Sequence, residues 1–377
     1  MNFVISKNLL YNQIQIVDKA VAPKSNVAIL SRIRMEVKEN NLTITASDLE
    51  NTITTTTAIE DCNGECVVAI EAESLKIIKG LPEQPLSIEV DQEENTFSIV
   101  FQNGSYNLSC IDGNDFPQTP VLRGETKTSI EIPSEVILNG INYTLFAAAK
   151  DEMRPIMNGI NVAFSEDGVY FAATDGQRLS RYLQSEIMLG KEISFVFPRK
   201  PAEILKNILP KSEKILNLEF DDKNAVITFD NIKYVCRFQE GNFPNYQQII
   251  PKNNPYKIIV DRLDILSTVQ RVAQVANKSQ QLIGFTFNDN IAKIVGSDIE
   301  YATSGKEEIA CQYEGEKFRI GFKSNVIIEI LSALNSKNVV FELSDPSRAG
   351  LIVPYEKENI NEDVLMLAMP LMILDED

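Results

Sequence analysis

Apolar and polar positions along the chain follow two alternating patterns. Short apolar runs such as Val169–Ala172 predict strands, whereas Leu10, Ile14 and Val17 recur at the spacing of an amphipathic helix. The helical pattern occurs six times, over residues 6–24, 72–82, 133–154, 199–211, 261–278 and 323–337, with strand patterns and turn signals between these spans. The sequence therefore predicts an α+β fold.

One strand–turn–strand element occurs three times. Residues 173–180 read Ala-Thr-Asp-Gly-Gln-Arg-Leu-Ser, in which the aspartate can bond its own downstream backbone and the glycine tolerates a positive φ, so a tight turn is predicted. The same element surrounds Asp48, 127 residues before Asp175, and Asp298, 123 residues after it. A Phe-Pro or Met-Pro pair keeps the same step, at Pro117, Pro244 and Pro370.

A period near 125 residues has the size of a domain, because solenoid repeats span only about 20–50 residues. We therefore predict three copies of one domain, over residues 1–123, 124–252 and 253–377, each with two helices.

The composition indicates a globular protein of the cytoplasm. Hydrophobic residues make up 44% of the 377 residues, which is ample for globular cores. No run approaches the ~18 apolar residues of a membrane helix, and the N-terminus lacks the pattern of a secretory signal. The five cysteines are odd in number and scattered, so free thiols are expected: Cys62, Cys66, Cys110, Cys236 and Cys311.

No catalytic, metal-binding or cofactor-binding pattern stands out. The chain contains no histidine, which removes Ser-His and Cys-His dyads and the commonest transition-metal ligand. Cys62 and Cys66 have no second pair nearby, and zinc sites need one. Ser304-Gly305-Lys306 lacks the upstream glycine of a phosphate loop and lies in a strand pattern. We therefore expect no catalytic residue, no metal and no cofactor.

The net charge of the chain is negative, but the charges are unevenly distributed along it. The net charge of −17 by itself argues against nucleic acid, because affinity for DNA comes mostly from neutralised phosphates. The six helical spans nevertheless contain 16 Lys and Arg against 9 Asp and Glu, and the remainder contains 20 against 44. Ordinary surface charge on helices is one interpretation. The other is that the helices share a face toward a polyanion, with the outer acids screened beyond a Debye length of about 8 Å.

Two further features favour binding surfaces. Arg199 and Lys200 stand at the start of a predicted helix, where cations oppose the helix dipole, which favours an anion nearby. The chain also remains apolar almost to its end: Val364–Ala368 predicts a last core strand, and Met369–Ile373 a partly exposed patch that binds partners.

The chain resembles the bacterial β sliding clamp family, the processivity subunit of the replicative DNA polymerase. The resemblance covers the whole chain and is carried by residues 173–179, Pro198-Arg199-Lys200, the Gly-x-Phe-Pro-x-Tyr run at 241–246, Gly321-Phe322 and Met369-Pro370-Leu371. It implies a head-to-tail homodimer whose six domains close into a ring, with helices lining the central hole and antiparallel sheets outside. The ring encircles double-stranded DNA without reading its sequence, and it tethers the polymerase by topology rather than by catalysis.

The resemblance also implies three sets of residues. DNA contacts map to Lys24, Lys150, Arg154, Arg199, Lys200 and Lys278. A groove for partner peptides between the second and third domains maps to Met157, Thr174, Gly176, Arg178, Leu179, Pro244, Ile249, Val326, Leu367, Met369, Pro370 and Leu371. The dimer contact pairs Tyr106 and Leu108 with the helix around Val275.

The implied partners are the replicative polymerase catalytic subunit, the clamp loader, and other proteins with clamp-binding motifs, such as repair polymerases, mismatch repair proteins and ligase. No membrane partner is implied, and the expected location is the cytoplasm, in association with the nucleoid. The sequence departs from the family at Gln177 and Gln248, often basic, and at Met372, usually arginine. Pro155 and Ile156 replace aromatic residues, and the acidic extension Leu374–Asp377 is expected to cover the groove in part, so the sequence predicts a different peptide preference.

Two other functions are compatible with parts of the sequence. An enzyme acting on nucleic acid with carboxylate-bound magnesium is one, although three degenerate copies of a domain rarely build a single active site. A scaffold ring that binds peptides but never DNA is the other, and retention on circular DNA separates it from a clamp.

Overall fold

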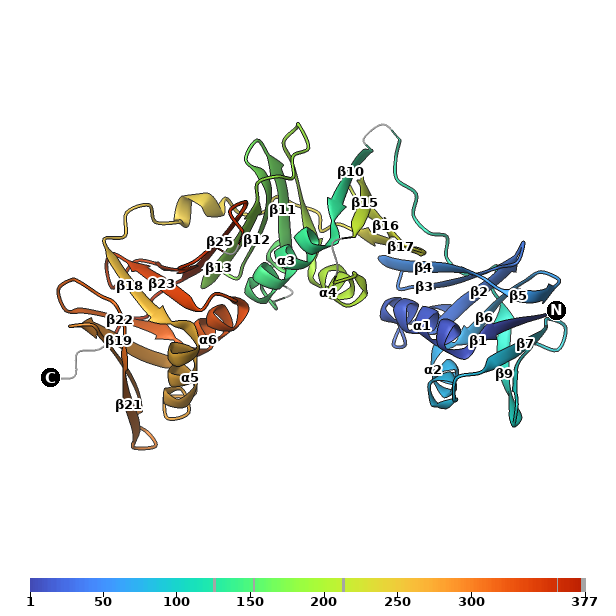
Figure 1. Ribbon diagram of the computed structural model, residues 1–377, viewed down its shortest axis with the longest axis horizontal. Helices are drawn as coiled ribbons and strands as arrows, with labels where there is room; N and C mark the ends of the chain where they lie inside the picture. The colour runs from blue at the N-terminus through green and yellow to red at the C-terminus, as the bar shows by residue number, and fades with distance from the viewer. Residues whose placement is uncertain (125–126, 152, 212–213, 358, 374–377) are drawn as a thin grey trace. The chain divides into compact units, whose positions relative to one another are not determined.

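The computed structural model describes residues 1–377 apart from 125–126, 152, 212–213, 358 and 374–377. In the described chain, one α+β arrangement occurs three times (Figure 1). Each repeat contains two four-stranded antiparallel sheets and two α-helices, and each of these helices directly follows a strand. The threefold repetition predicted from the sequence markers is therefore confirmed.

The first repeat has one additional strand. Its first sheet consists of β1 (Asn2–Ser6), β7 (Pro85–Asp91), β8 (Thr96–Phe101) and β9 (Gly104–Asp112), with β5 (Glu60–Asn63) beside β1. Its second sheet consists of β6 (Cys66–Glu71), β2 (Arg32–Lys38), β3 (Asn41–Ser47) and β4 (Asn51–Ala58). The helix α1 (Lys7–Val17) follows β1, and α2 (Ala72–Leu75) follows β6.

The second and third repeats keep the same order. In the second, the sheets are β10 (Thr128–Pro133), β15 (Ile215–Phe220), β16 (Asn224–Phe229) and β17 (Ile232–Arg237), and β14 (Ile193–Pro198), β11 (Gly159–Ser165), β12 (Gly168–Thr174) and β13 (Arg178–Gln184). In the third they are β18 (Tyr256–Asp261), β23 (Asn338–Leu343), β24 (Gly350–Pro354) and β25 (Glu362–Ala368), and β22 (Phe318–Lys323), β19 (Leu282–Asn288), β20 (Ile291–Asp298) and β21 (Thr303–Ala310). The helices are α3 (Ser134–Thr144), α4 (Arg199–Ile208), α5 (Arg262–Val272) and α6 (Ser324–Ala333).

Contacts divide the chain into two compact units that do not follow the repeat. The first unit contains residues 1–135 and 203–238, and the second contains 136–202 and 239–377. In the first unit, α1 and α2 lie on the same side of the sheet β6–β2–β3–β4, and in the second, α5 and α6 pack against each other (Figure 1). The two sheets of the second repeat belong to different units.

Both units contain a sheet that continues from one repeat into the next. In the first unit β4 pairs antiparallel with β17, and Thr52 lies opposite Val235. In the second unit β13 pairs antiparallel with β25, and Leu179 lies opposite Leu367. Each junction therefore joins the strand after the aspartate turn of one repeat to the last strand of the following repeat.

The three aspartate turns have the same hydrogen bonds. Asp48 Oδ1 accepts from the backbone N–H groups two and three residues later at 3.0 and 2.6 Å. Asp175 Oδ1 accepts from the equivalent groups at 2.9 and 3.0 Å, and Asp298 Oδ1 at 2.9 and 3.3 Å. This is the local turn chemistry that the sequence predicted, because a short carboxylate can satisfy the N–H groups that a reversing chain leaves unpaired.

The helices are shorter than the sequence pattern predicted. The chain is 3-10 rather than α-helical in η1 (Asp18–Ala20), η3 (Lys76–Gly80) and η4 (Leu145–Ala147), and the described residues from 148 to 154 lie outside any α-helix. Three successive alanines favour helix by propensity. Ala147, Ala148 and Ala149 are instead fully packed at 0–2% exposure, and the Ala149 N–H donates to the Met157 carbonyl at 2.9 Å, so tertiary contacts override propensity.

The start of the third helical span was also predicted wrongly. Pro133 was predicted to open a helix, but it ends β10 opposite Ile215, and the helix begins at Ser134. Because β10 is an edge strand, the missing N–H of the proline leaves no ladder bond unmade. After the first helical span, residues 28–31 form the 3-10 turn η2 (Ala28–Ser31), and β2 begins at Arg32.

Candidate partner-binding surface and basic positions

The turn between β12 and β13 is fixed by its own side chains. Gly176 has φ +88, a conformation that L side chains rarely adopt. Thr174 Oγ1, which is buried, donates to the Arg178 carbonyl at 2.6 Å and accepts from the Gly176 N–H at 3.1 Å. These bonds, with those of Asp175, determine where the turn stands relative to the sheet below it.

Arg178 is buried in this turn, with 7% of its side chain exposed. Its Nε donates to Asp175 Oδ2 at 3.1 Å, its Nη1 pairs with the Glu329 carboxylate, and its guanidinium lies 5.5 Å from the centre of the Phe146 ring. The guanidinium therefore ties the turn to α6 and to the end of η4. It positions the predicted groove from below.

Beneath the turn lies a small apolar cluster. Leu179 and Leu367 face each other across the β13–β25 junction at 0% and 1% exposure, and they pack with Ala172, Tyr246 and Leu351. Phe243 and Ile250 cover the cluster in part. The Phe-Pro marker of the second repeat thus lies in the segment that packs against the sheet at the junction.

The end of the chain adds the next part of this surface. The Met369 N–H donates to the Gln177 carbonyl at 2.9 Å, and the Leu371 N–H donates to the Gly321 carbonyl of β22 at 2.8 Å. Met369 is 43% exposed and Ile249, in η6 (Tyr246–Ile249), is 51% exposed. The predicted partly exposed patch therefore exists for Met369, while Leu371 is half-buried.

Arg154, directly before η5 (Pro155–Met157), reaches the same turn. Arg154 Nη1 donates to the Asp175 carbonyl at 3.2 Å, while its Nε lies 3.6 Å from Asp151 Oδ2. Met157 at the end of η5 is half-buried. Arg154, which the resemblance assigns to the DNA contacts, therefore also contacts the turn that the resemblance assigns to the peptide groove.

The twelve residues predicted for the groove all belong to the second unit, but they are of two kinds. Five are buried: Thr174, Arg178, Leu179, Val326 and Leu367. The others are exposed or half-exposed: Met157, Gly176, Pro244, Ile249, Met369, Pro370 and Leu371. Val326 stands apart, since it belongs to the core cluster of the third repeat.

Sequence reasoning missed three residues that hold this surface in place. Glu329 and Phe146 orient Arg178, and Lys323 Nζ donates to Gln177 Oε1 at 3.0 Å. These are long-range contacts that no local pattern marks. Ile373, the last residue of the predicted patch, packs over Gly284 and over Gly321, which its motif had signalled.

The six predicted DNA-contacting cations lie outside the middle of the helices. Lys24, Lys150, Arg154 and Lys278 are exposed in loops or turns, and Lys200 is exposed in the first turn of α4. Arg199 is half-buried, and its Nη2 donates to the carbonyls of Leu145 and Ala148 at 3.4 and 3.0 Å. Arg199 therefore satisfies carbonyl groups at the end of η4.

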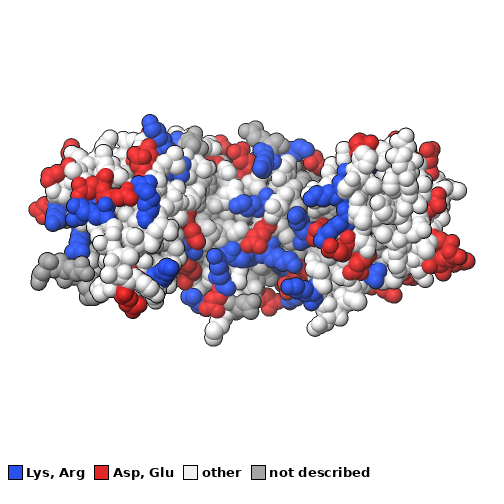
Figure 2. Space-filling model, turned by 90° about the horizontal axis from the view of Figure 1, so that it is seen from below, with Lys and Arg blue, Asp and Glu red and all other residues white. Residues whose placement is uncertain are grey.

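The interpretation of the helices as basic needs a correction. The α-helices α1 to α6 contain six Lys and Arg against five Asp and Glu, so the excess of cations found over the longer spans lies in the flanking turns. Figure 2 shows Lys and Arg side chains on the face seen from below, interspersed with acidic ones. Loops that flank helices can present cations as well as helices do, because long Lys and Arg side chains reach several ångströms from the backbone.

The residues predicted for the dimer contact lie on β9 and in the turn after α5. Tyr106 on β9 is 43% exposed, stacks on Phe101 at 5.6 Å between ring centroids, and shares a face with the half-buried Leu108. Val275 lies in the turn after α5 rather than in the helix, and its carbonyl accepts from Thr303 Oγ1 of β21 at 3.0 Å.

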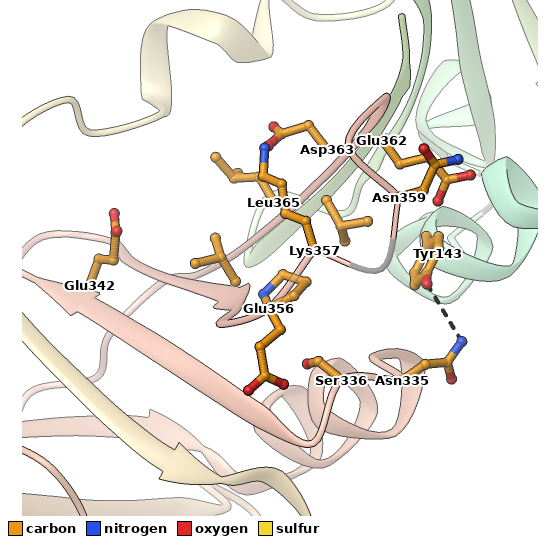
Figure 3. Close-up of a pocket in the computed structure, with 13 residues that line it drawn as sticks. Tyr143, Asn335, Ser336, Glu342, Glu356, Lys357, Asn359, Glu362, Asp363 and Leu365 are labelled. Atoms are coloured by element: carbon orange, nitrogen blue, oxygen red, sulfur yellow. Dashed lines mark hydrogen bonds and ion pairs between the residues drawn. The ribbon is translucent and has the colours of Figure 1, made fainter.

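A cavity of about 240 Å³ with both polar and apolar lining residues lies elsewhere in the second unit, at the start of β25 (Figure 3). Tyr143, Glu342, Lys357, Glu362 and Asp363 are among its lining residues, and Asn335 donates weakly to the Tyr143 hydroxyl at 3.5 Å. Burial raises the pKa of Asp363, but its bonds to Lys357 at 2.9 Å and to Arg181 at 2.5 Å outweigh this, and the pKa lies below the ordinary value. The predicted groove residues are not among the residues that line this cavity.

Three further observations complete the picture. The five cysteines are separate thiols, four of them buried, and burial raises the pKa of Cys236 to about 12. Among the described residues, no group of three or more Cys, Asp or Glu side chains is arranged to hold a metal ion. Nor does the described part of the chain contain a helix long and apolar enough to cross a membrane.

Known proteins match the chain along its whole length. Three family models match in order: the DNA polymerase III beta subunit N-terminal domain over residues 1–120, the central domain over 131–245 and the C-terminal domain over 247–369. The Beta sliding clamp of Staphylococcus aureus (strain Mu50 / ATCC 700699) is 24% identical over 376 residues, covering 97% of this chain and 98% of that protein. The Staphylococcus epidermidis protein of the same name is 24% identical over 375 residues, with the same coverage.

Solved structures share the fold. A DNA polymerase sliding clamp from Pseudomonas aeruginosa matches with a TM-score of 0.91 and 23% identity, and the DNA polymerase III beta subunit from Thermotoga maritima with 0.90 and 23%. Each match covers 99% of this chain and 100% of the other. Together with the three family models, the triplicated two-sheet fold therefore defines a sliding clamp of the three-domain class.

Within that class, the three successive domain models decide the family. The chain belongs to the bacterial β sliding clamps, the beta subunit of DNA polymerase III. This confirms the predicted function, a DNA sliding clamp for polymerase processivity that is not itself an enzyme. The membership implies DNA and polymerase as partners.

Proposed function

We propose that two copies of this chain close head to tail into a ring around double-stranded DNA, with the helices and their flanking basic turns facing the hole. The domains are residues 1–123, 124–252 and 253–377. The ring holds the polymerase catalytic subunit at its template, and it also serves the clamp loader and repair proteins that contain clamp-binding motifs. Its place is the cytoplasm, in association with the nucleoid.

One observation carries this proposal: two of three equivalent strand junctions close within the chain, and the third is open. The strand after the aspartate turn pairs with the last strand of the next repeat at β4–β17 and at β13–β25. The equivalent strand of the third repeat is β21, which pairs only with β20 in the described chain. The last strand of the first repeat is β9, whose residues 104–109 pair only with β8 there.

Open edges of this kind attract another strand, because their N–H and C=O groups lack partners. Pairing β21 of one copy with β9 of a second copy would satisfy both edges, and the same contact made twice would close a ring of two chains. A head-to-tail contact requires one open strand edge in the first repeat and one in the third, and β9 and β21 provide them.

The repeats also predict the register of that pairing. Ser304 occupies the position of Thr52 and Leu179, since each pairs with the residue just before the aspartate of its turn. Thr52 faces Val235 and Leu179 faces Leu367, and the equivalent residue of β9 is Asn107. Ser304 of one copy therefore lies opposite Asn107 of the other, which sets Tyr106 against Gly305.

This register brings the three predicted contact residues together. A Cβ on Gly305 would lie 2.7 Å from Val275 Cγ2, so Val275 already covers that glycine. The ring of Tyr106, opposite Gly305, then meets Val275, and Leu108 lies opposite Thr303. An aromatic side chain over a cross-strand glycine is a known stabilising pair in sheets.

DNA binding rests on charge without sequence readout. Lys24, Lys150 and Lys278 are exposed and form no ion pair with another described residue, so their charges are available to phosphates. Together with Arg154, Arg199 and Lys200 they form the proposed DNA-contacting set. A few nonspecific phosphate contacts per chain hold DNA weakly, as a ring that must slide requires.

Partner peptides bind the surface around the Asp175 turn. The exposed apolar side chains of Ile249 and Met369 flank the buried Leu179–Leu367 floor, and Met157, Gly176, Pro244, Pro370 and Leu371 complete the rim. Gln177, Met372 and Gln248 give this surface fewer charges than the resemblance leads one to expect. The predicted covering of the groove by Leu374–Asp377 lies outside the described residues.

A cysteine pair tests the ring and its register together. In a hydrogen-bonded antiparallel pair the Cα atoms lie about 5.5 Å apart, within disulfide range. We expect Asn107→Cys with Ser304→Cys to yield a covalent dimer of about 84 kDa on mild oxidation, twice the 42.2 kDa chain. The matched control, Asn107→Cys with Thr303→Cys, places the two thiols on opposite faces and should stay monomeric on a non-reducing gel.

Retention on DNA then separates a clamp from a scaffold. The double-cysteine variant, loaded by clamp loader onto nicked circular DNA under reducing conditions and then oxidised, should remain through gel filtration and leave when the circle is linearised. A reduced dimer that is never retained on the circle would support the peptide-binding scaffold instead, and robust nuclease activity with magnesium would support the enzyme. Absence of the cross-link in dimers detected by light scattering would refute the register.

A further inference from the structure

Two glycines face each other in the third repeat where the other repeats have side chains. Gly284 of β19 lies opposite Gly321 of β22. The equivalent pairs are Arg34 opposite Ala69 in the first repeat and Asn161 opposite Val196 in the second. Glycine inside a strand weakens it and often marks a place where another part of the chain approaches closely. Because only the third repeat has a pair of facing glycines at this position, we infer that another part of the chain approaches the sheet closely there.

The chain that approaches is the C-terminal segment. A Cβ on Gly321 would lie 2.7 Å from the Leu371 carbonyl oxygen and 2.8 Å from Ile373 Cγ1, and a Cβ on Gly284 would lie 3.3 Å from Ile373 Cδ1. Leu371 forms a single antiparallel bridge with Gly321. The two glycines therefore leave the space that the backbone at Leu371 and the side chain of Ile373 occupy.

In the other two repeats an equivalent segment also meets the sheet at this position, but there the side chains belong to the sheet strands. In the first repeat the end of β9 pairs with β6, with Ile111 opposite Ala69, and in the second repeat the chain after β17 bridges back at Gln239 opposite Val196. Two residues beyond those positions stand Gly113 and Gly241, whereas two residues beyond Leu371 stands Ile373. In the first two repeats the glycine lies in the segment that crosses the sheet, and the sheet strands have side chains at the crossing. In the third repeat the glycines lie in the sheet strands, and the crossing segment has the side chain.

We propose that Gly284 and Gly321 form a seat for Ile373, and that this seated side chain positions Met369 and Leu371 for binding partner peptides. The inference rests on the proposed function in assigning the peptide site to that surface. The segment is held at two other points, the Met369 bond to Gln177 and the Leu371 bond to Gly321. Ile373 adds the apolar contact that keeps Leu371 on the sheet, so it is a positioning residue that need not touch the peptide.

Neighbouring residues of the segment provide a matched pair of variants. Ile373 is half-buried over the glycines, while Met372 is 88% exposed. Ile373→Ala should release the segment, so that carboxypeptidase digestion, followed by mass spectrometry, proceeds past Met369 at least tenfold faster than in the wild type. Met372→Ala should be digested at close to the wild-type rate.

Peptide affinity should follow the same order. A fluorescein-labelled peptide containing the clamp-binding motif of a replicative polymerase should bind Ile373→Ala about tenfold more weakly, equivalent to ~1.4 kcal/mol. Met372→Ala should bind within twofold of the wild type, and Ile373→Leu should recover most of the affinity. Equal affinity of Ile373→Ala and wild type would overturn the inference.

A substitution on the other side of the contact completes the test without relying on one variant. Gly284→Ala alone should weaken binding, because the new methyl group meets Ile373 at 3.3 Å. Combined with Ile373→Ala it should cause little additional loss, since the methyl group then occupies vacated space. Additive losses would overturn the inference. If no variant, nor the wild type, bound the peptide, the proposed peptide site would fail, and digestion would still decide whether the seat holds the segment.

Discussion

Arg178 offers the most direct test of how the candidate peptide surface is held in place. Its side chain is 93% buried, and its guanidinium bonds two carboxylates, one in the turn and one on α6. Replacing Arg178 by alanine would leave Asp175 and Glu329 without their cation. The chemistry of the turn would remain, because Asp175 Oδ1 still accepts from two N–H groups.

The magnitude follows from the burial of the three groups. Removing one partner of a fully buried pair costs about 3–5 kcal/mol. The side chains of Asp175 and Glu329 are 22% and 38% exposed, so water can compensate in part. We therefore expect Arg178→Ala to lower the free energy of unfolding by about 2–3 kcal/mol. The pair formed by Arg271 and Glu307 is the matched control, since its side chains are 57% and 33% exposed and solvent screens most of its attraction, so its loss should lower the stability much less.

The assay is urea unfolding followed by far-UV circular dichroism, which suits a chain without tryptophan. Hydrogen exchange gives the local readout: the amides of Gln177 and Arg178 should exchange faster in Arg178→Ala than in the wild type. Arg178→Lys should recover little, because an ammonium group cannot donate to two carboxylates in the planar geometry of the guanidinium. A loss of stability no greater than that of Arg271→Ala, with unchanged exchange, would refute the positioning role.

The remaining predictions concern the two proposed surfaces and the turn. Lys200→Glu should weaken retention on circular DNA at low salt about tenfold and reduce its salt dependence, because a phosphate contact is replaced by repulsion; Lys38→Glu, on an exposed strand position, is the matched control, and equal retention by both variants would count against the inner-face assignment. Met369→Ala with Leu371→Ala should abolish peptide binding in a fluorescence titration while light scattering still shows a dimer, and unchanged affinity would contradict the groove assignment. Gly176→Val should destabilise the turn by about 1–2 kcal/mol, since φ +88 is strained for a side chain; a melting temperature equal to the wild type would show that the turn relaxes.

The repetition was visible in the sequence because its markers are local. An aspartate turn depends on residues within three positions of each other, so Asp48, Asp175 and Asp298 could be recognised without knowing the fold. Helix lengths were not predictable in the same way. Ala147–Ala149 have the propensity of a helix, but burial and the bond from Ala149 to Met157 place them in another conformation.

The residues of the candidate surface also fall into those that local motifs signal and those that long-range contacts position. Gly176, Met369 and Leu371 could be assigned from motifs, because turns and exposed apolar ends are signalled by neighbouring residues. The role of Arg178 could not, since its partner Glu329 is 151 residues away. The number of excess cations was also predicted correctly, but they were assigned to the helices rather than to the flanking turns. The sequence pattern does not show where a helix ends and its flanking turn begins.

The sequence alone determined that this chain is three copies of one α+β domain with aspartate turns at equivalent places. Period, turn chemistry and apolar spacing are properties of short segments. Only the tertiary structure decided which strands join the repeats, which edges stay open on β9 and β21, and why Gly284 and Gly321 are glycines. Those features depend on backbone hydrogen bonds and close packing between segments far apart in the chain, and no single segment contains that information.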